Sequence, residues 1–211
     1  LLVIDDKVLV TPAGHKTTMV ALDKESGEVI WQTKTLHDTA GYASPIIIQE
    51  NGKIIAVNVL ANNVFGVDIV NGEILFSGNY SEVDDERAFA LWNSASASRI
   101  NTNDAVYLNH EIYVTSGYNH SGVKYKLSDD LSNIEVVWTD SVLDVHFGGV
   151  VLVDGYLYGS NFTGRNSGKW VCMNWKTGEI VWIGDFHNKG PIIYADDMLY
   201  CYDEKRGNRA Q

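Results

Sequence analysis

Short apolar runs alternate with tight polar turns along the whole chain. The apolar run at residues 150–153 meets a turn at Asp154 and Gly155, and a second β-rich run follows at residues 156–158. Two such runs joined by a two-residue polar turn form the pattern of a β-hairpin. Equivalent turns are Asp5-Asp6, Asn51-Gly52, Asn109-His110 and Asp196-Asp197. No stretch has helical periodicity, so the pattern predicts an all-β protein.

A second motif recurs in phase with these turns. Gly-Glu-Val-Ile-Trp at residues 27–31 is repeated as Gly-Glu-Ile-Leu-Phe at 72–76 and as Gly-Glu-Ile-Val-Trp at 178–182, with a degenerate copy at 133–138. The aromatic residues stand at positions 31, 76, 138 and 182, so the steps between them are 45, 62 and 44 residues. Repeats of about 45 residues, each with four short strands, are typical of the blades of a β-propeller.

We therefore expect one β-propeller segment over residues 1–211, built from four-stranded antiparallel blades whose strands are named A to D from the inside outward. The expected blades cover residues 1–35, 43–78, 98–139 and 147–184, and residues 191–202 supply strands A and B of a fifth. The long step of 62 residues places an inserted loop at residues 79–97. About four and a half blades are thus present.

The blade motif also carries a family resemblance. The run Ala-Leu-Asp-Lys-Glu-Ser-Gly-Glu-Val-Ile-Trp at residues 21–31 resembles the repeat of the pyrroloquinoline-quinone-like, or quinoprotein alcohol dehydrogenase-like, propellers. That superfamily includes the quinoprotein alcohol dehydrogenases, proteins related to polyvinyl-alcohol dehydrogenase, and the lipoprotein propeller of the outer-membrane assembly machinery. The resemblance implies that the chain is part of a seven- or eight-bladed ring and that it is periplasmic, secreted or otherwise in the cell envelope.

Propeller geometry sorts the loops onto two faces. The A–B and C–D turns share one face, which we call the hairpin face; the B–C loops and the D-to-A connectors share the other, the loop face. The loop face has the longer segments, and function in such folds collects on loops held by a rigid scaffold. The expected ligand-binding residues there are Tyr42, Trp92, Arg99, Asn101, Asn103 and His146. The inner residues among them have an alternative role, because they could instead form hydrogen bonds to neighbouring blades.

The inserted loop at residues 79–97 leaves two questions open. Trp92 could stack on a sugar or plug the central channel, or it could simply pack onto the propeller. The run Glu-Val-Asp-Asp-Glu-Arg at residues 82–87 has carboxylates that suit Ca²⁺, but it lacks the alternating spacing of a calcium loop. We interpret it as a solvated charged loop and expect no metal site.

Charge and composition exclude several classes of function. The chain has 16 Lys and Arg against 27 Asp and Glu, a net charge of −11, so it lacks the basic stripe of a nucleic-acid-binding protein. No apolar run approaches the roughly 20 residues of a transmembrane helix. Cys172 and Cys201 have no metal-type spacing and are expected to be buried free thiols, with a disulfide as the alternative if their strands are neighbours.

Two functions remain. The favoured one is a non-catalytic propeller that serves as a binding or assembly scaffold for a protein or carbohydrate partner on the loop face. The alternative is a dehydrogenase that oxidises alcohols with pyrroloquinoline quinone and Ca²⁺, which also needs a carboxylate base. The adjacent cysteine pair common in such dehydrogenases is missing, and the repeat tryptophans belong to outer strands, where we expect them to pack between blades. No cofactor and no catalytic residue is predicted with the scaffold.

Overall fold

Consecutive strands pair into antiparallel sheets in the order of the chain. In the computed structural model, residues 1–83, 100–164, 167–184, 188–204 and 209–210 are described. The first sheet contains β1 (Leu2–Ile4), β2 (Lys7–Val10), β3 (Val20–Asp23) and β4 (Val29–Gln32), and the second contains β5 (Ile46–Glu50), β6 (Lys53–Val59), β7 (Asn63–Asp68) and β8 (Ile74–Asn79). The third contains β9 (Val106–Leu108), β10 (Glu111–Val114), β11 (Gly122–Leu127) and β12 (Ile134–Asp140), and the fourth contains β13 (Val150–Val153), β14 (Tyr156–Ser160), β15 (Trp170–Asn174) and β16 (Ile180–Gly184).

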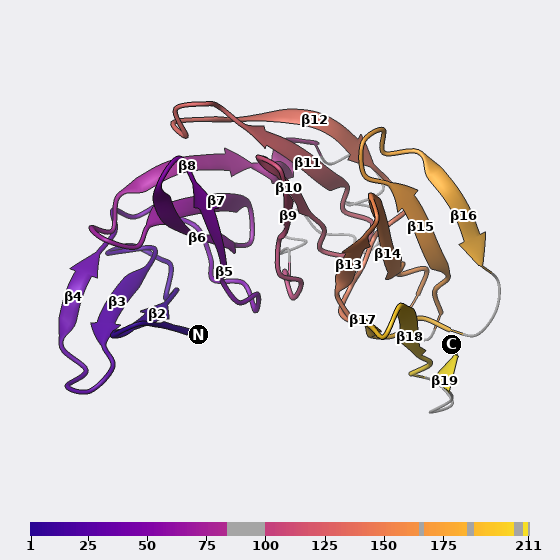
Figure 1. The fold of residues 1–211 in the computed structure, drawn as a ribbon, viewed down its shortest axis with the longest axis horizontal. Coiled ribbons are helices and arrows are strands. Elements are labelled where there is room, and N and C mark those ends of the chain that lie inside the picture. Colours follow the sequence, from indigo (N-terminus) through magenta and orange to yellow (C-terminus); the bar gives the residue numbers. More distant parts are fainter. Residues whose placement is uncertain (84–99, 165–166, 185–187, 205–208, 211) are drawn as a thin grey trace.

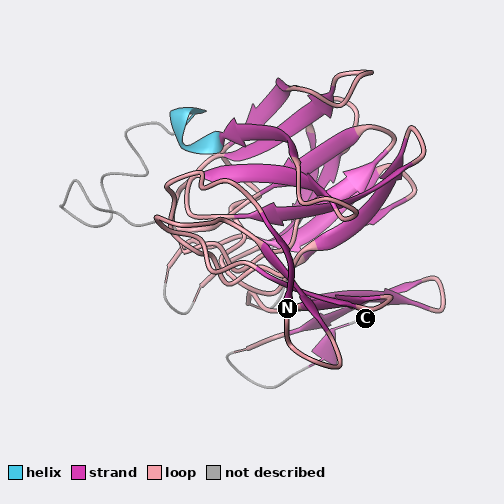
Figure 2. Ribbon diagram, turned by 90° about the vertical axis from the view of Figure 1, so that its left-hand side faces the viewer, coloured by secondary structure: helices cyan, strands magenta, loops and turns pink. Residues whose placement is uncertain are grey.

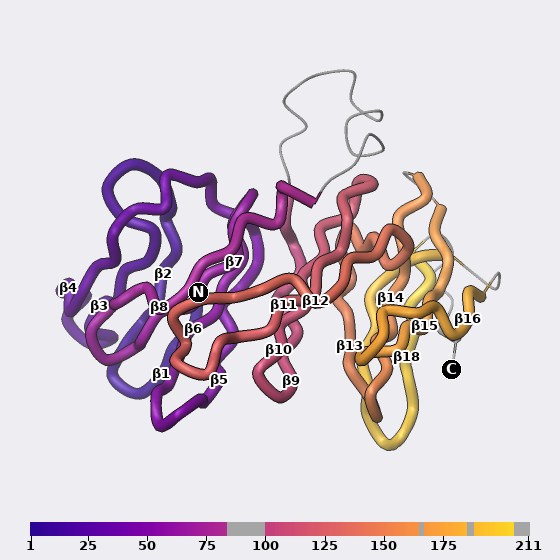
Figure 3. Tube along the Cα trace, turned by 90° about the horizontal axis from the view of Figure 1, so that it is seen from above, coloured from indigo at the N-terminus to yellow at the C-terminus, as the bar shows by residue number. Residues whose placement is uncertain are grey.

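The last sheet is shorter than the others. It contains β17 (Ile192–Ala195) and β18 (Met198–Tyr202), as expected, and a two-residue third strand, β19 (Arg209–Ala210), which the sequence pattern did not predict. The five sheets follow one another around an arc, with strand A of each blade on the concave side and strand D outside (Figure 1). Seen from above, they stand side by side from the indigo to the yellow end of the chain (Figure 3). The prediction of an all-β propeller with about four and a half blades is confirmed.

The hairpin turns have the geometry that their sequences demand. Both central residues of the turns at Asn51-Gly52, Asn109-His110, Asp154-Gly155 and Asp196-Asp197 have positive φ. This is the condition for a type I′ turn, whose twist matches that of the flanking strands, and Asn, Asp and Gly accept it at the lowest cost. These turns lie at one end of the sheets, and the short 3₁₀ helix η1 (Tyr80–Val83) lies with the loops at the other end (Figure 2).

A β-bulge precedes the aromatic residue of every complete blade. In the first blade, Ala21 pairs with Trp31 but Leu22 pairs with Val29, so Ile30 is an extra residue in strand D. The same one-residue shift follows the pairs Gly66–Phe76, Lys124–Trp138 and Cys172–Trp182. A bulge turns the following side chain out of the regular alternation. The repeated bulge therefore aims each aromatic residue at the next blade.

Two tryptophans in this orientation form contacts with the next blade. Trp31 donates its indole N–H to the carbonyl oxygen of Ile69 in the second blade at 2.9 Å, and Trp138 donates to Trp175 in the fourth blade at 3.2 Å. Glycine is required where each ring lies, because a Cβ on Gly72 would be 2.7 Å from the Trp31 ring and one on Gly178 would be 2.8 Å from the Trp138 ring. The expectation that the repeat tryptophans pack between blades is confirmed for these two.

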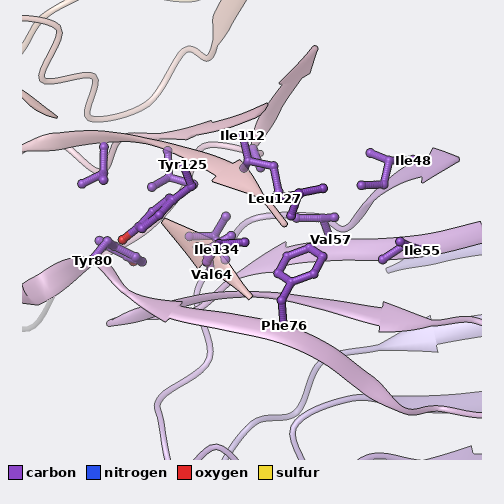
Figure 4. Packing of buried hydrophobic residues seen from close by; sticks show 14 of the residues in the cluster. Ile48, Ile55, Val57, Val64, Phe76, Tyr80, Ile112, Tyr125, Leu127 and Ile134 are labelled. Carbon is purple, nitrogen blue, oxygen red and sulfur yellow. The ribbon is translucent and has the colours of Figure 1, made fainter. Parts of the chain in front are cut away.

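The hydrophobic core is divided among the seams between blades. One buried cluster joins the second and third blades, where Val57 and Phe76 meet Ile112 and Leu127 (Figure 4). A second cluster joins the first and second blades, and a third joins the third and fourth. Close packing along each seam makes the blades a rigid support for the loops at their ends.

Candidate functional site: the loop face of the third and fourth blades

Connectors between blades tie the loop face together. The Asp38 carboxylate, in the connector after the first blade, accepts hydrogen bonds from the backbone N–H and the side-chain amide of both Asn62 and Asn63. In the connector after the third blade, Asp144 accepts from the backbone N–H of Asn119 at 2.7 Å, and its carbonyl accepts from Phe162 at 2.8 Å. Each connector is thus hydrogen-bonded to B–C loops, which fixes these segments of the loop face relative to one another.

Two of the expected binding residues lie between blades. Asn101 is fully buried; its side-chain amide donates to the carbonyl of Leu60 at 3.0 Å and contacts the hydroxyl of Tyr80. Asn103 donates to the carbonyl of Val145 at 2.6 Å and accepts from the backbone N–H of Gly149 at 3.2 Å. These contacts match the alternative role considered above, hydrogen bonding to neighbouring blades. A part for either residue in binding a ligand stays a prediction.

The other expected residues are scattered. Tyr42 is 78% exposed on the connector after the first blade, and its backbone N–H donates to the carbonyl of Asn101 at 2.6 Å. Trp92 and Arg99 lie outside the described residues, as does most of the inserted loop at residues 79–97. His146, by contrast, lies within a group of aromatic side chains.

Three aromatic rings surround His146. The centroid of its imidazole is 4.3 Å from the ring of Tyr118, 4.9 Å from Phe147 and 5.3 Å from Phe162. We call these four residues the aromatic cluster. Tyr118 comes from the B–C loop of the third blade, Phe162 from that of the fourth, and Phe147 is 42% exposed. The cluster therefore presents aromatic surface at the seam between two blades.

One ion pair adjoins the aromatic cluster. The ammonium group of Lys189, which is buried, lies 4.7 Å from the Phe147 ring centroid and pairs with the carboxylate of Glu204. Burial, and next the positive charge of Lys189, lower the pKa of His146, while Glu204 opposes this shift. His146 is therefore neutral at pH 7, and its buried Nδ1 has no hydrogen-bond partner among the described residues.

Close backbone approach explains the glycines around His146. A Cβ on Gly117 would lie 2.4 Å from the Cα of His146, and one on Gly148 would lie 2.7 Å from the carbonyl oxygen of Gly190. Sequence reasoning selected His146 but missed Tyr118, Phe147, Phe162 and Lys189. Aromatic residues within B–C loops and connectors were the available signal for Tyr118, Phe147 and Phe162, whereas Lys189 carried no such signal.

A quinone-dependent dehydrogenase would need residues that hold Ca²⁺ and the quinone. Among the described residues, no group of three or more His, Cys, Asp or Glu side chains converges to hold a metal ion. Cys172 on β15 and Cys201 on β18 are both free and belong to different sheets, so a disulfide between them is not formed. The amide nitrogens of Asn101 and Asn103 donate hydrogen bonds across the seams, while the buried Oδ1 of Asn101 has no hydrogen-bond partner among the described residues.

A family model and solved structures resemble the chain. The model described as outer membrane protein assembly factor BamB matches residues 1–184. The crystal structure of BamB from Moraxella catarrhalis aligns with a TM-score of 0.64 and 14% identity, covering 99% of this chain and 61% of that one. No curated protein matches the sequence. Within the described residues, no helix is long and apolar enough to cross a membrane.

Two dehydrogenases share the fold at lower similarity. Quinohemoprotein alcohol dehydrogenase from Comamonas testosteroni aligns with a TM-score of 0.56 and 12% identity over 99% of this chain and 38% of that one. The enzyme ADHIIG from Pseudomonas putida HK5 gives 0.55 and 15% over 99% and 40%. The chain thus spans about three fifths of the length of BamB and two fifths of the dehydrogenases. Identities this low show the fold alone.

Proposed function

The chain belongs to the family of the outer membrane protein assembly factor BamB, and from that premise we propose that it is a non-catalytic scaffold that binds a protein partner in the bacterial envelope. Membership also confirms the resemblance to the pyrroloquinoline-quinone-like propellers. The family description is that of a factor in outer membrane protein assembly, a role that calls for protein partners. A periplasmic or secreted location follows from the same proposal.

We place the binding surface at the aromatic cluster because of one observation. The aromatic cluster presents Phe147, 42% exposed, on a loop face that the connectors hold in place. Protein interfaces are enriched in aromatic residues, and a few such anchors supply most of the binding energy. Because His146 is neutral and Lys189 is already paired with Glu204, the cluster is mostly apolar and suits an apolar anchor of a protein partner better than a charged ligand.

Affinity capture with point variants tests this surface. The immobilised protein would be crosslinked to envelope extract, and the captured species would be identified and titrated in purified form. Truncating a hot-spot residue typically costs about 2 kcal/mol or more, so we expect Phe147→Ala and Tyr118→Ala to weaken binding by about tenfold or more. Tyr156→Ala is the matched control, because Tyr156 is an exposed aromatic residue at a turn of the hairpin face. Equal losses in all three variants would contradict the proposal.

A second assay addresses the dehydrogenase. The protein would be titrated with pyrroloquinoline quinone and Ca²⁺ while dye-linked oxidation of primary alcohols is followed. The scaffold proposal expects no saturable quinone binding and no turnover. Saturable binding accompanied by turnover would replace the scaffold with the enzyme.

A further inference from the structure

Two Asn-Gly dipeptides occur in the chain, and the fold gives them different surroundings. Asn51 and Gly52 form the turn between β5 and β6, whereas Asn71 and Gly72 lie in the turn between β7 and β8. Such a pair can react with itself, because glycine has no side chain to shield its backbone nitrogen from the neighbouring side-chain amide. The contacts of each turn determine whether the two groups can meet.

The reaction in question is deamidation, which replaces the side-chain amide of asparagine with a carboxylate. The backbone nitrogen of the glycine loses its proton to water and forms a bond to the Cγ of the asparagine. The bond between Cγ and Nδ2 breaks, and the side-chain nitrogen leaves as ammonia. Water then opens the resulting cyclic imide at either carbonyl and leaves aspartate or isoaspartate. Because water is the only co-reactant, the surroundings of the pair determine the rate.

Three contacts protect the pair in the turn between β7 and β8. The N–H of Gly72 donates to the carbonyl of Asp68 at 2.9 Å, and the Oδ1 of Asn71 accepts from the backbone N–H of Glu73 at 2.9 Å. Gly72 is buried beneath the Trp31 ring, which would lie 2.7 Å from a Cβ at this position. The attacking nitrogen and the side chain that it would attack are therefore both held, and their rearrangement displaces a buried ring.

The pair in the turn between β5 and β6 lacks these contacts. Asn51 and Gly52 are both exposed, and a Cβ on Gly52 would meet no atom within 4 Å. Among the described residues, the N–H of Gly52 forms no backbone hydrogen bond. The side-chain amide of Asn51 donates to the carbonyl of Asp129 at 2.6 Å, also at an exposed position. Rotation of this turn toward the reactive geometry therefore displaces solvent and an exposed hydrogen bond.

From these contacts we propose that Asn51 is a site of spontaneous deamidation, and that the reaction cuts a link between the second and third blades on the hairpin face. Nδ2 of Asn51 supplies the proton of that link, which reaches the carbonyl of Asp129 in the next blade. A carboxylate has no proton to donate and would lie against the same carbonyl oxygen. It would also add a negative charge beside Glu50, whose carboxylate is 2.9 Å from the Nδ1 of His110 in the third blade. The proposal is independent of the proposed function.

The isoaspartate product would alter the turn itself. Asn51 and Gly52 have φ of 49° and 76°, and they connect Glu50 to Lys53, which are partners in the register. Isoaspartate carries the backbone through its side-chain carbon and so lengthens this connection by a methylene group. The longer connection no longer has the twist that a two-residue turn shares with its strands. Both products therefore act at the same end of the second blade.

Peptide mapping of the aged protein tests the site. The folded protein would be incubated at neutral pH, and the peptides that contain Asn51 and Asn71 would be quantified by mass spectrometry. We expect Asn51 to deamidate at least about tenfold faster than Asn71, because attack at Asn71 requires loss of the Gly72 hydrogen bond and displacement of the Trp31 ring. In guanidinium chloride these contacts are absent, so the two sites should react at similar rates.

Substitutions test the effect on the link. Asn51→Asp reproduces the aspartate product and should lower the urea midpoint of unfolding, since it removes the donor to Asp129. Asn71→Asp is the matched control, because an aspartate there still accepts from the N–H of Glu73 and should leave the midpoint unchanged. Equal rates at the two sites in the folded protein, or no deamidation at Asn51, would overturn the proposal. Equal midpoints for Asn51→Asp and Asn71→Asp would overturn it as well.

Discussion

A buried lysine replaces a small residue at one position of the repeat. The residues opposite the aromatic ones are Ala21, Gly66 and Cys172 in three blades, but Lys124 in the third. Lys124 is 1% exposed. Its ammonium group lies 2.6 Å from the Glu111 carboxylate, 2.8 Å from the carbonyl oxygen of Trp175 and 4.5 Å from the centroid of the Trp175 ring. The seam between the third and fourth blades therefore contains one desolvated charge beside its apolar cluster.

Breaking this pair from either side should have unequal effects. Glu111→Gln leaves a buried ammonium group without its counter-ion, and we expect the free energy of unfolding to fall by about 3 kcal/mol, at the lower end for a buried pair because Glu111 is partly exposed. Lys124→Met keeps the length of the side chain and leaves Glu111 bonded to the indole N–H of Trp175, so about 1 kcal/mol is expected.

Urea unfolding of both variants measures the two losses. Lys126→Met is the control, because Lys126 is exposed on the same strand and should change stability by less than about 0.5 kcal/mol. A loss for Lys124→Met equal to or larger than that for Glu111→Gln would contradict the view that the uncompensated ammonium dominates.

His146 should make stability depend on pH. Because burial, and next the charge of Lys189, lower its pKa below 6.5, the unfolded chain takes up a proton first as the pH falls. The contribution of neutral His146 is therefore fully present above pH 6.5 and declines as the pH drops from there to the folded-state pKa. We expect the free energy of unfolding of His146→Phe to fall less between about pH 7.5 and about pH 5.5 than that of the unchanged protein. Urea midpoints measured at the two pH values test this. His15→Gln, at an exposed site, is the control, and an unchanged slope in His146→Phe would contradict the assignment.

At the scale of the blade, the sequence predicts the strands and turns but not the contacts between blades. The turns could be predicted because Asn, Asp and Gly are needed locally at positive φ, as at Asn51 and Gly52. The bulge could not, because the motif at residues 27–31 does not reveal that Ile30 is unpaired until the partner strand is known. The role of Gly72 was hidden for the same reason, since the ring that requires it lies 41 positions earlier, at Trp31.

Two glycines of the second blade separate these effects. Gly72 and Gly52 both have a φ of 76°, but a Cβ on Gly52 would meet no atom within 4 Å, whereas one on Gly72 would lie 2.7 Å from Trp31. We expect Gly52→Ala to cost about 1 kcal/mol from backbone strain alone. Gly72→Ala should cost about 3 kcal/mol, because the Trp31 ring must also move. Denaturant titration measures both, and equal losses would show that the ring contact contributes nothing.

At the scale of the molecule, each seam between blades holds its own part of the core. The candidate site lies at one such seam, and the sequence of a single blade predicts only part of it. The alternating direction of the strands predicts which loops share the loop face. The position of His146 just before strand A of the fourth blade predicts that it lies on that face. The aromatic cluster was not predicted, because Tyr118 and Phe162 belong to the B–C loops of different blades and meet only when the two blades pack. The same modular packing predicts how stability is distributed along the arc, since each blade of a repeat protein is stabilised by its neighbours.

The last sheet should be the first to open. Buried clusters join the first blade to the second, the second to the third and the third to the fourth, and of the last sheet's β17 and β18 only Ile192 is a buried hydrophobic residue. Ile193, Tyr194 and Met198 are all more than 40% exposed. Because local opening follows from few buried apolar contacts, we expect amide hydrogens of β17 and β18 to exchange at least about tenfold faster than those of β6 and β7.

Hydrogen exchange followed by mass spectrometry measures this difference, with peptides from β10 and β11 as the protected reference. Equal protection of β17–β18 and β6–β7 would mean that the arc unfolds as one unit.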